Sequence, residues 1–475
     1  MKIIKVVYFF LFYALTLSFF LSIGADYPAH IHFRMLLGGA VFLAGIFVVD
    51  RSKWHGHPIK LCAFFMMAFL GFIVLRALWA FVCHSIFHTP ASETFPYTAY
   101  LKSPIRWAYC VILFLLSGVT FYDRKKTYEL SFVMILGALF IALNAIPAQL
   151  IYKSFGYEVA TGEFRFFYPG FYFHPWISRY LLSPLSHPNF VGDFISFGFF
   201  PALGVSLYAL FDILDPHTSR DSEDEPKSIL LSRSLLFFVL GMISFAAILL
   251  LFSRGTMVSV GLSLGVFVLF LLAKYPKKRF AKGVALIFLI GIPFLFWAGN
   301  LKKAWHEIQT LDKEMEGVGS IEVTEEGIKR GLGMFKDYPI WGAGSENYAN
   351  LSLKYSTPGI NSTSYYLAQF QTTCHYVHLM AEEGVGGIIY AFFIIIYLCQ
   401  MIRLLVLTKS RFKFLMGLSF FCAVVSILIH ASINDLMQRF STSMLTYVMM
   451  GASLAMLRES KRDHRSSGLI EPSAV

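Results

Sequence analysis

The sequence predicts an all-α polytopic membrane protein, from its composition, its long apolar runs and the placement of its basic residues. Of the 475 residues, 56% are hydrophobic, 17% are aromatic and only 15% are charged. The mean hydropathy is +0.62. A soluble domain of this length carries far more charge, so these values exclude that class of protein.

Apolar runs long enough to cross about 30 Å of hydrocarbon occur about twelve times along the chain. The first run, residues 3–23, follows Lys2 and Lys5. We interpret it as a transmembrane helix rather than a signal peptide, because it is long and no small-residue cleavage site is clear before Asp26. The other predicted spans cover residues 33–49, 59–83, 105–121, 128–150, 190–213, 229–252, 255–273, 282–299, 384–405, 413–432 and 438–456.

Basic residues between these spans fall on one side of the predicted membrane, which places both termini in the cytoplasm. The acidic loop at residues 215–227 is the exception, and acidic residues contribute little to this rule. The same rule explains the formal net charge of +11, so nucleic acid is not an expected partner, whereas the lipid bilayer is. The basic segments are residues 51–53, 124–126, 274–279, 403–413 and the tail after residue 457.

The opposite face of the predicted membrane carries the three longer loops, near residues 84–104, 151–189 and 300–383. Functional residues are expected there, because irregular polar backbone folds only where water or protein covers it. The predicted regions are 1–189 (the first five spans and their outer loops), 190–299 (the next four spans), 300–383 (a large periplasmic helical loop), 384–457 (the last three spans) and 458–475 (a cytoplasmic tail).

A histidine-bearing stretch, TTCHYVHLMAEEGVGG, opens the predicted span at residues 384–405. On a helix, its spacing places His375, His378 and Glu382 on one stripe. An imidazole with a carboxylate one turn away is the minimal arrangement for a general base held in a defined tautomer. The alternative is a polar helix entrance whose histidines only line the membrane interface, and the spacing alone does not separate the two.

Cationic side chains on the outer face are candidates for binding phosphate. Arg254, in LLLFSRGTMVSVG, lies between two apolar runs, where a charge is costly unless it has a partner or faces water. The alternative is an arginine at a helix end that extends toward water. Lys329 and Arg330 are adjacent cations that would suit a diphosphate beside Arg254, or would form a solvated helix face. Arg179 is a further candidate.

Another polar stretch, SHPNFVGDFISFGFFP, places His187 and Asn189 at the opening of a predicted span. The alternative for Asn189 is a helix cap. Neither a Walker loop nor a sugar-nucleotide metal motif is found where it would be functional, which argues against soluble nucleotide substrates. The six cysteines lie singly, mostly in apolar runs and without CxxC spacing. The sequence therefore predicts no disulfide framework, no metal site and no cofactor.

Together, the SRG junction, the HPN stretch, DYPIWGAGSENY and CHYVHLMAEEGVGG resemble the O-antigen ligase and polymerase superfamily over about residues 185–430. The resemblance implies a GT-C-like membrane fold in the bacterial inner membrane, with the active face in the periplasm. It implies a metal-independent glycosyltransferase that moves a glycan from undecaprenyl diphosphate to a lipid or glycan acceptor. It also implies a histidine that acts on the acceptor and arginines, here Arg254, that hold the diphosphate.

The sequence departs from the family pattern at the histidine. Counting back from Glu382 and Gly384, the usual histidine and asparagine positions fall on Thr373 and Cys374. His375 lies two positions further on and is the expected base. The second arginine of the family would fall near Thr324, and either Arg330 or Lys329 lies less than two helical turns later.

The resemblance leaves the acceptor open. An O-antigen ligase acting on lipid A-core is the expected function, with a polysaccharide polymerase or a protein O-oligosaccharyltransferase as alternatives. A transporter is the competing class, and it would show an internal repeat and charges near the membrane midplane. No clear repeat relates the two halves of this chain. A non-catalytic relative of the same fold is the other alternative.

Overall fold

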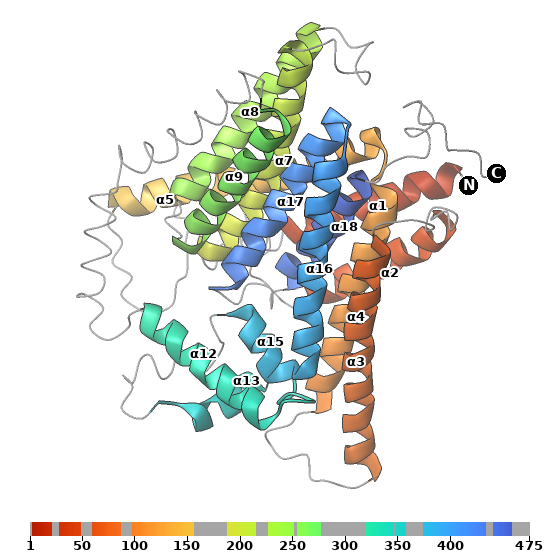
Figure 1. Cartoon of the computed structure of the whole chain (residues 1–475), viewed down its shortest axis with the longest axis vertical. Helices are drawn as coiled ribbons and strands as arrows, with labels where there is room; N and C mark the ends of the chain where they lie inside the picture. The colour runs from red at the N-terminus through yellow and green to blue at the C-terminus, as the bar shows by residue number, and fades with distance from the viewer. Residues whose placement is uncertain are drawn as a thin grey trace, which may run out of the picture.

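The structure is a computed structural model, and every regular element that it describes is helical (Figure 1). The predicted all-α class is therefore confirmed for these parts of the chain. The described residues are 2–20, 28–48, 59–86, 97–155, 188–214, 227–250, 254–276, 320–345, 347–357, 374–433 and 440–457.

The helices follow one another without any strand among the described residues. They are α1 (Lys2–Phe20), α2 (Pro28–Val48), α3 (Ile59–Ile86), α4 (Tyr97–Thr120), α5 (Arg124–Phe155), α7 (Pro188–Leu214), α8 (Lys227–Leu250), α9 (Arg254–Lys274), α12 (Ser320–Asp337), α13 (Tyr348–Leu351), α15 (His375–Glu383), α16 (Val385–Leu407), α17 (Arg411–Ala431) and α18 (Phe440–Met456), with the 3-10 helix η3 (Ser352–Tyr355).

Nine of the described helices are long and apolar enough to cross a membrane, which confirms a multi-pass membrane protein. Helices α2 and α18 contribute shorter apolar stretches, Leu36–Val48 and Thr442–Met456. The predicted span at residues 282–299 lies outside the described residues, so the count of about twelve stays a prediction. The nine spans are α1, α3, α4, α5, α7, α8, α9, α16 and α17.

Helices α7 and α17 form the centre of the bundle. In the apolar spans of these two helices, 94% and 83% of the residues are buried. In that of α8 only 28% are buried, so α8 lies at the periphery. The two central helices pack against each other. A buried polar pair joins the two helices at each end. Arg411 Nη1 lies 3.3 Å from Asp212 Oδ1 at one end, and His430 Nδ1 lies 2.7 Å from Asp193 Oδ1 at the other.

Close approach of α4 and α18 depends on glycine. A Cβ added at Gly451 would overlap the Ser117 hydroxyl and the Phe114 carbonyl oxygen, and would lie 2.9 Å from the Gly118 nitrogen. Small residues allow this kind of packing in membranes, where helices associate through contact rather than through exclusion of water.

The segment before α16 forms a small helical layer with its own core. Helices α12, α13, η3 and α15 pack on one another at one end of the bundle, beside the start of α16 (Figure 1). Their shared core consists of Met334, Ala343, Tyr348, Leu351 and Ala381, with Tyr355 packed against it. This layer carries the histidine stretch.

We predict that Gly451→Ala lowers the stability of the purified protein by about 1–3 kcal/mol, because the new methyl group overpacks the α4–α18 contact. Thermal unfolding in detergent measures the effect. Gly261→Ala in α9 is the matched control, since no atom lies within 4 Å of an added Cβ there. Equal unfolding temperatures for the two variants would contradict the described packing.

Candidate functional site

The candidate site is built where the loop after α12 docks against the end of α15. Ala343 N donates to Ala381 O at 2.9 Å, and Gly344 N donates to Glu382 O at 3.0 Å. Val385 N, at the start of α16, donates in return to Ile340 O at 3.1 Å. These bonds satisfy carbonyls that the end of a helix leaves without a partner, so the loop is fixed to the helix backbone.

Two glycines make this docking possible. Gly342 has φ of +69° and Gly384 has φ of +57°, a conformation that other residues rarely adopt. A Cβ at Gly342 would also overlap the Glu382 carbonyl, and one at Gly384 would overlap the Ile340 carbonyl. Gly342 of DYPIWGAG and Gly384 of EEGVGG are therefore explained by one contact between the two motifs.

Glu382 is the acceptor at the centre of the site. Its Oε1 accepts a hydrogen bond from Tyr348 N at 3.1 Å and lies 3.2 Å from His378 Nε2. The Tyr348 ring lies against the imidazole of His378, with centroids 5.0 Å apart. All three residues are buried, so the imidazole lies between the carboxylate and the tyrosine ring, away from solvent.

His375 lies one turn earlier and faces different neighbours. Its ring is buried, 6.0 Å from that of Tyr376 and 5.9 Å from that of Tyr390 in α16. Tyr447 in α18 donates to the Tyr390 hydroxyl at 3.0 Å. The structure therefore brings Glu382 to the second histidine of the stripe, and places the first where α15 meets the membrane helices.

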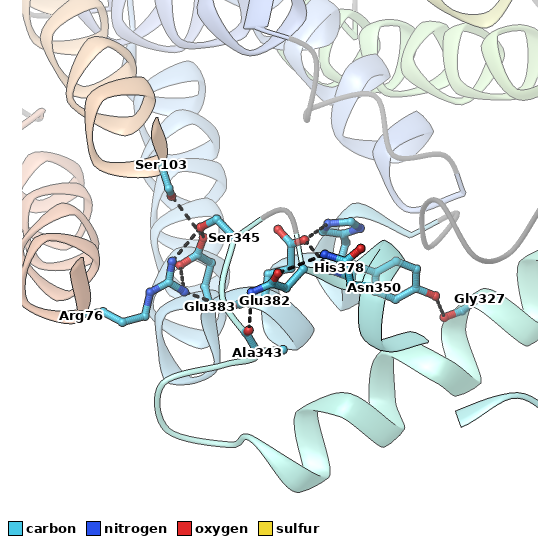
Figure 2. A network of polar contacts seen from close by, with 11 residues as sticks. Arg76, Ser103, Gly327, Ala343, Ser345, Asn350, His378, Glu382 and Glu383 are labelled. Atoms are coloured by element: carbon cyan, nitrogen blue, oxygen red, sulfur yellow. Dashed lines mark hydrogen bonds and ion pairs between the residues drawn. The ribbon is translucent and has the colours of Figure 1, made fainter. Parts of the chain in front are cut away.

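Arg76, in the middle of the apolar helix α3, holds the docked loop against the bundle (Figure 2). Its Nη1 donates to Glu382 O at 2.7 Å and forms an ion pair with Glu383. Its Nη2 donates to Ser345 Oγ at 2.7 Å. Glu383 Oε1 also accepts from Ser345 at 2.7 Å and from Ser103 of α4 at 3.2 Å. One guanidinium thus joins the loop, the end of α15 and the transmembrane helices.

This cluster was not predicted from the sequence. Arg76 is 3% exposed and Glu383 is 2% exposed. A buried pair of this kind is tolerated when hydrogen bonds satisfy its remaining atoms, as the two serine hydroxyls do here for Glu383 Oε1. The available signal was an arginine inside a predicted span, which marks a functional position in a membrane protein.

Lys329 and Arg330 follow each other on α12 but lie in different environments. Arg330 is fully buried, and its Nε donates to Glu326 Oε1 at 2.7 Å. Lys329 is exposed and pairs with Glu325 at 2.8 Å. Burial alone would raise the pKa of Glu326, but hydrogen bonds from Thr357 and Arg330 lower it below its ordinary value. Arg330 therefore stabilises the helical layer, and only Lys329 reaches solvent.

The other candidates lie at helix openings or outside the described residues. Arg254 is the first residue of α9, and Asn189 lies in the first turn of α7. Only their backbones are described. Arg179 and His187 lie outside the described residues.

The α9 opening is nevertheless connected to the histidine stretch. The Tyr376 hydroxyl donates to Leu428 O of α17 at 3.2 Å, two residues before His430. The imidazole of His430 in turn lies directly against Gly255, the residue after Arg254. The end of α17 thus contacts both α15 and α9.

The arrangement is suited to proton transfer. It offers a buried imidazole with a carboxylate oxygen 3.2 Å away, at one end of the helical bundle. Within the described ranges, no cluster of three or more His, Cys, Asp or Glu side chains has the geometry to hold a metal ion.

Comparison with known proteins agrees with the family resemblance of the sequence motifs. No curated protein matches the chain. Residues 238–392, less than half of the 475 residues, match the family model described as O-antigen ligase. The matched segment includes the SRG junction, α12, the docked loop and α15. The resemblance predicted from the sequence is thereby confirmed: residues 238–392 of this chain are similar to the O-antigen ligase family.

Proposed function

We propose that this protein transfers a glycan from undecaprenyl diphosphate to an acceptor hydroxyl. The observation that carries the proposal is that the O-antigen ligase match spans both Arg254 and the buried His378–Glu382 pair. The first acceptor to consider is lipid A-core, as for an O-antigen ligase. A polysaccharide polymerase and a protein O-oligosaccharyltransferase are the alternatives within the superfamily. The inner membrane, with the site on its periplasmic face, is the proposed location.

In the proposed reaction, the acceptor oxygen attacks the anomeric carbon of the glycan. The bond from that carbon to the phosphate oxygen breaks, and the lipid diphosphate leaves with the electron pair. A histidine of α15 takes the hydroxyl proton. The contact with Glu382 favours His378 as this base, because a carboxylate 3.2 Å from Nε2 stabilises the imidazolium that forms. His375, which the sequence favoured, is the alternative.

Arg254 is the proposed ligand of the donor diphosphate. Negative charge builds on the leaving diphosphate in the transition state, and a guanidinium stabilises it without a metal ion. Arg330 is less suited to this role, because it is buried and bound to Glu326. Lys329 is exposed and could contribute charge only from the surface of α12. Roles for Arg179, His187 and Asn189 remain proposals without described contacts.

The direct test is glycan transfer by purified protein from an undecaprenyl-diphosphate glycan, with lipid A-core and a second donor molecule offered as acceptors. We expect transfer to core by the wild type and a loss of about 100-fold or more for Arg254→Ala, since electrostatic groups of this kind contribute 10²–10³ to the rate. Elongation of the donor instead would identify a polymerase. Wild-type rates for Arg254→Ala would contradict the proposal.

A second prediction separates the two histidines. If His378 is the base, His378→Ala lowers kcat by about 10²–10⁴, whereas His375→Ala has a smaller effect. Glu382→Gln keeps the shape but removes the charge, so it should follow His378→Ala in direction. The same transfer assay measures all three. A larger loss for His375→Ala than for His378→Ala would assign the base to His375.

A third prediction concerns the arginine that holds the site together. Arg76→Met leaves Glu383 buried without its ion pair and should cost about 3–5 kcal/mol of stability. Adding Glu383→Gln should restore part of this loss, because the uncompensated charge is gone. Thermal unfolding measures both variants, with Arg403→Met on the exposed surface of α16 as the matched control. An unchanged unfolding temperature for Arg76→Met would contradict the buried pair.

A further inference from the structure

The opening of α9 is held by a buried pair that the proposed reaction does not use. Asp193 of α7 and His430 of α17 are both fully buried, with Oδ1 and Nδ1 2.7 Å apart. Within the described residues, His430 Nε2 has no hydrogen-bond partner. Ionisable groups inside membrane helices are costly and therefore mark positions with a specific task.

The edge of the His430 imidazole that carries Nε2, opposite the contact with Asp193, faces the first turn of α9. An added Cβ at Gly255 would overlap His430 Nε2 and would lie 2.7 Å from its Cδ2. Glycine at this position therefore lets the first turn of α9 lie directly on the ring. Arg254 is the first residue of α9 and immediately precedes Gly255. The backbone of Arg254 is therefore one residue away from the contact with the ring.

The same turn of α9 is held from α7 as well. Gly192 packs against Thr256, where an added Cβ would lie 2.6 Å from both the hydroxyl oxygen and the methyl carbon. One turn deeper, Ser259 donates to Thr256 O at 2.9 Å, and Ser426 of α17 donates to the Ser259 hydroxyl at 3.3 Å. The first turn of α9 is thus enclosed by polar and glycine contacts from both central helices.

We infer that His430 is a positioning residue for Arg254, with Asp193 as the residue that orients the imidazole. This inference rests on the proposed function, since it assigns the pair to the geometry of the donor diphosphate site. The contact of Nδ1 with Asp193 fixes the plane of the ring. The opposite edge of the ring fixes the position of Gly255 relative to α17. Because α17 also binds Tyr376 through Leu428 O, the pair keeps Arg254 in register with the histidines of α15.

The test uses substitutions that separate the two edges of the ring. His430→Asn keeps a short amide N–H that can donate to Asp193, but removes the atoms that face Gly255. Gly255→Ala adds a methyl group where the ring lies. The double variant places the methyl group in the space that the shorter side chain leaves. Ser432→Ala, on an exposed residue at the end of α17, is the matched control.

We expect each single variant to lower kcat/KM for the lipid-linked donor by about 10- to 100-fold, because small misplacements of a binding group have effects of this order. The KM for the acceptor should stay unchanged. The double variant should recover activity relative to Gly255→Ala. A wild-type rate for His430→Asn, or a double variant that folds and is no better than Gly255→Ala, would overturn the inference.

Thermal unfolding of the same variants distinguishes this inference from the proposed function. If the wild type transfers no glycan to any acceptor, the proposed function fails. The contact between His430 and Gly255 is then tested by the unfolding temperatures alone. A double variant that unfolds at a higher temperature than Gly255→Ala supports the contact between ring and helix, whereas equal temperatures contradict it.

Discussion

The guanidinium of Arg76 is the contact on which the candidate site depends. It lies in an apolar bundle, where a charge is stable only with partners close at hand. Those partners are the Glu383 carboxylate, the Glu382 carbonyl and the Ser345 hydroxyl, and they belong to segments that lie outside the membrane helices in sequence. Because a buried guanidinium without these partners would be costly, its contacts hold the loop and the end of α15 against the end of the bundle. The carboxylate of Glu382 is then placed beside His378.

The same constraint recurs through the central helices. Asp193–His430 and Asp212–Arg411 each join α7 to α17, one at each end of the pair of helices. Apolar contacts between helices in lipid do not specify register strongly, because lipid tails are as apolar as leucine. Buried polar pairs do specify register, since a shift of one helix would leave a buried polar group without its partner. We therefore expect these pairs to fix the register of α7 against α17. Gly451, by contrast, sets how closely α4 and α18 approach.

The sequence predicts the helical spans well because their signal is local. Apolar runs such as residues 59–83 and 413–432 correspond to α3 and α17 within a few residues. The stripe of His375, His378 and Glu382 was also predicted from local spacing, and the structure brings His378 and Glu382 together. Periodicity could not show which histidine contacts Glu382, because that depends on where Tyr348 and the docked loop lie. Nor could it show that Arg330 is buried while Lys329 is exposed. Arg76 and His430 contact residues more than two hundred positions away, and a single sequence carries no sign of such pairings.

The central claim is that this chain breaks a glycosyl–diphosphate bond rather than carrying a substrate across the membrane. The most direct measurement is the amount of free undecaprenyl diphosphate that purified protein forms from a lipid-linked glycan with and without an acceptor. The account predicts that lipid diphosphate appears only with an acceptor, in equal amount to the glycan joined to it. Movement of intact lipid-linked glycan across a reconstituted membrane, with no release of lipid diphosphate, would contradict the account and identify a transporter.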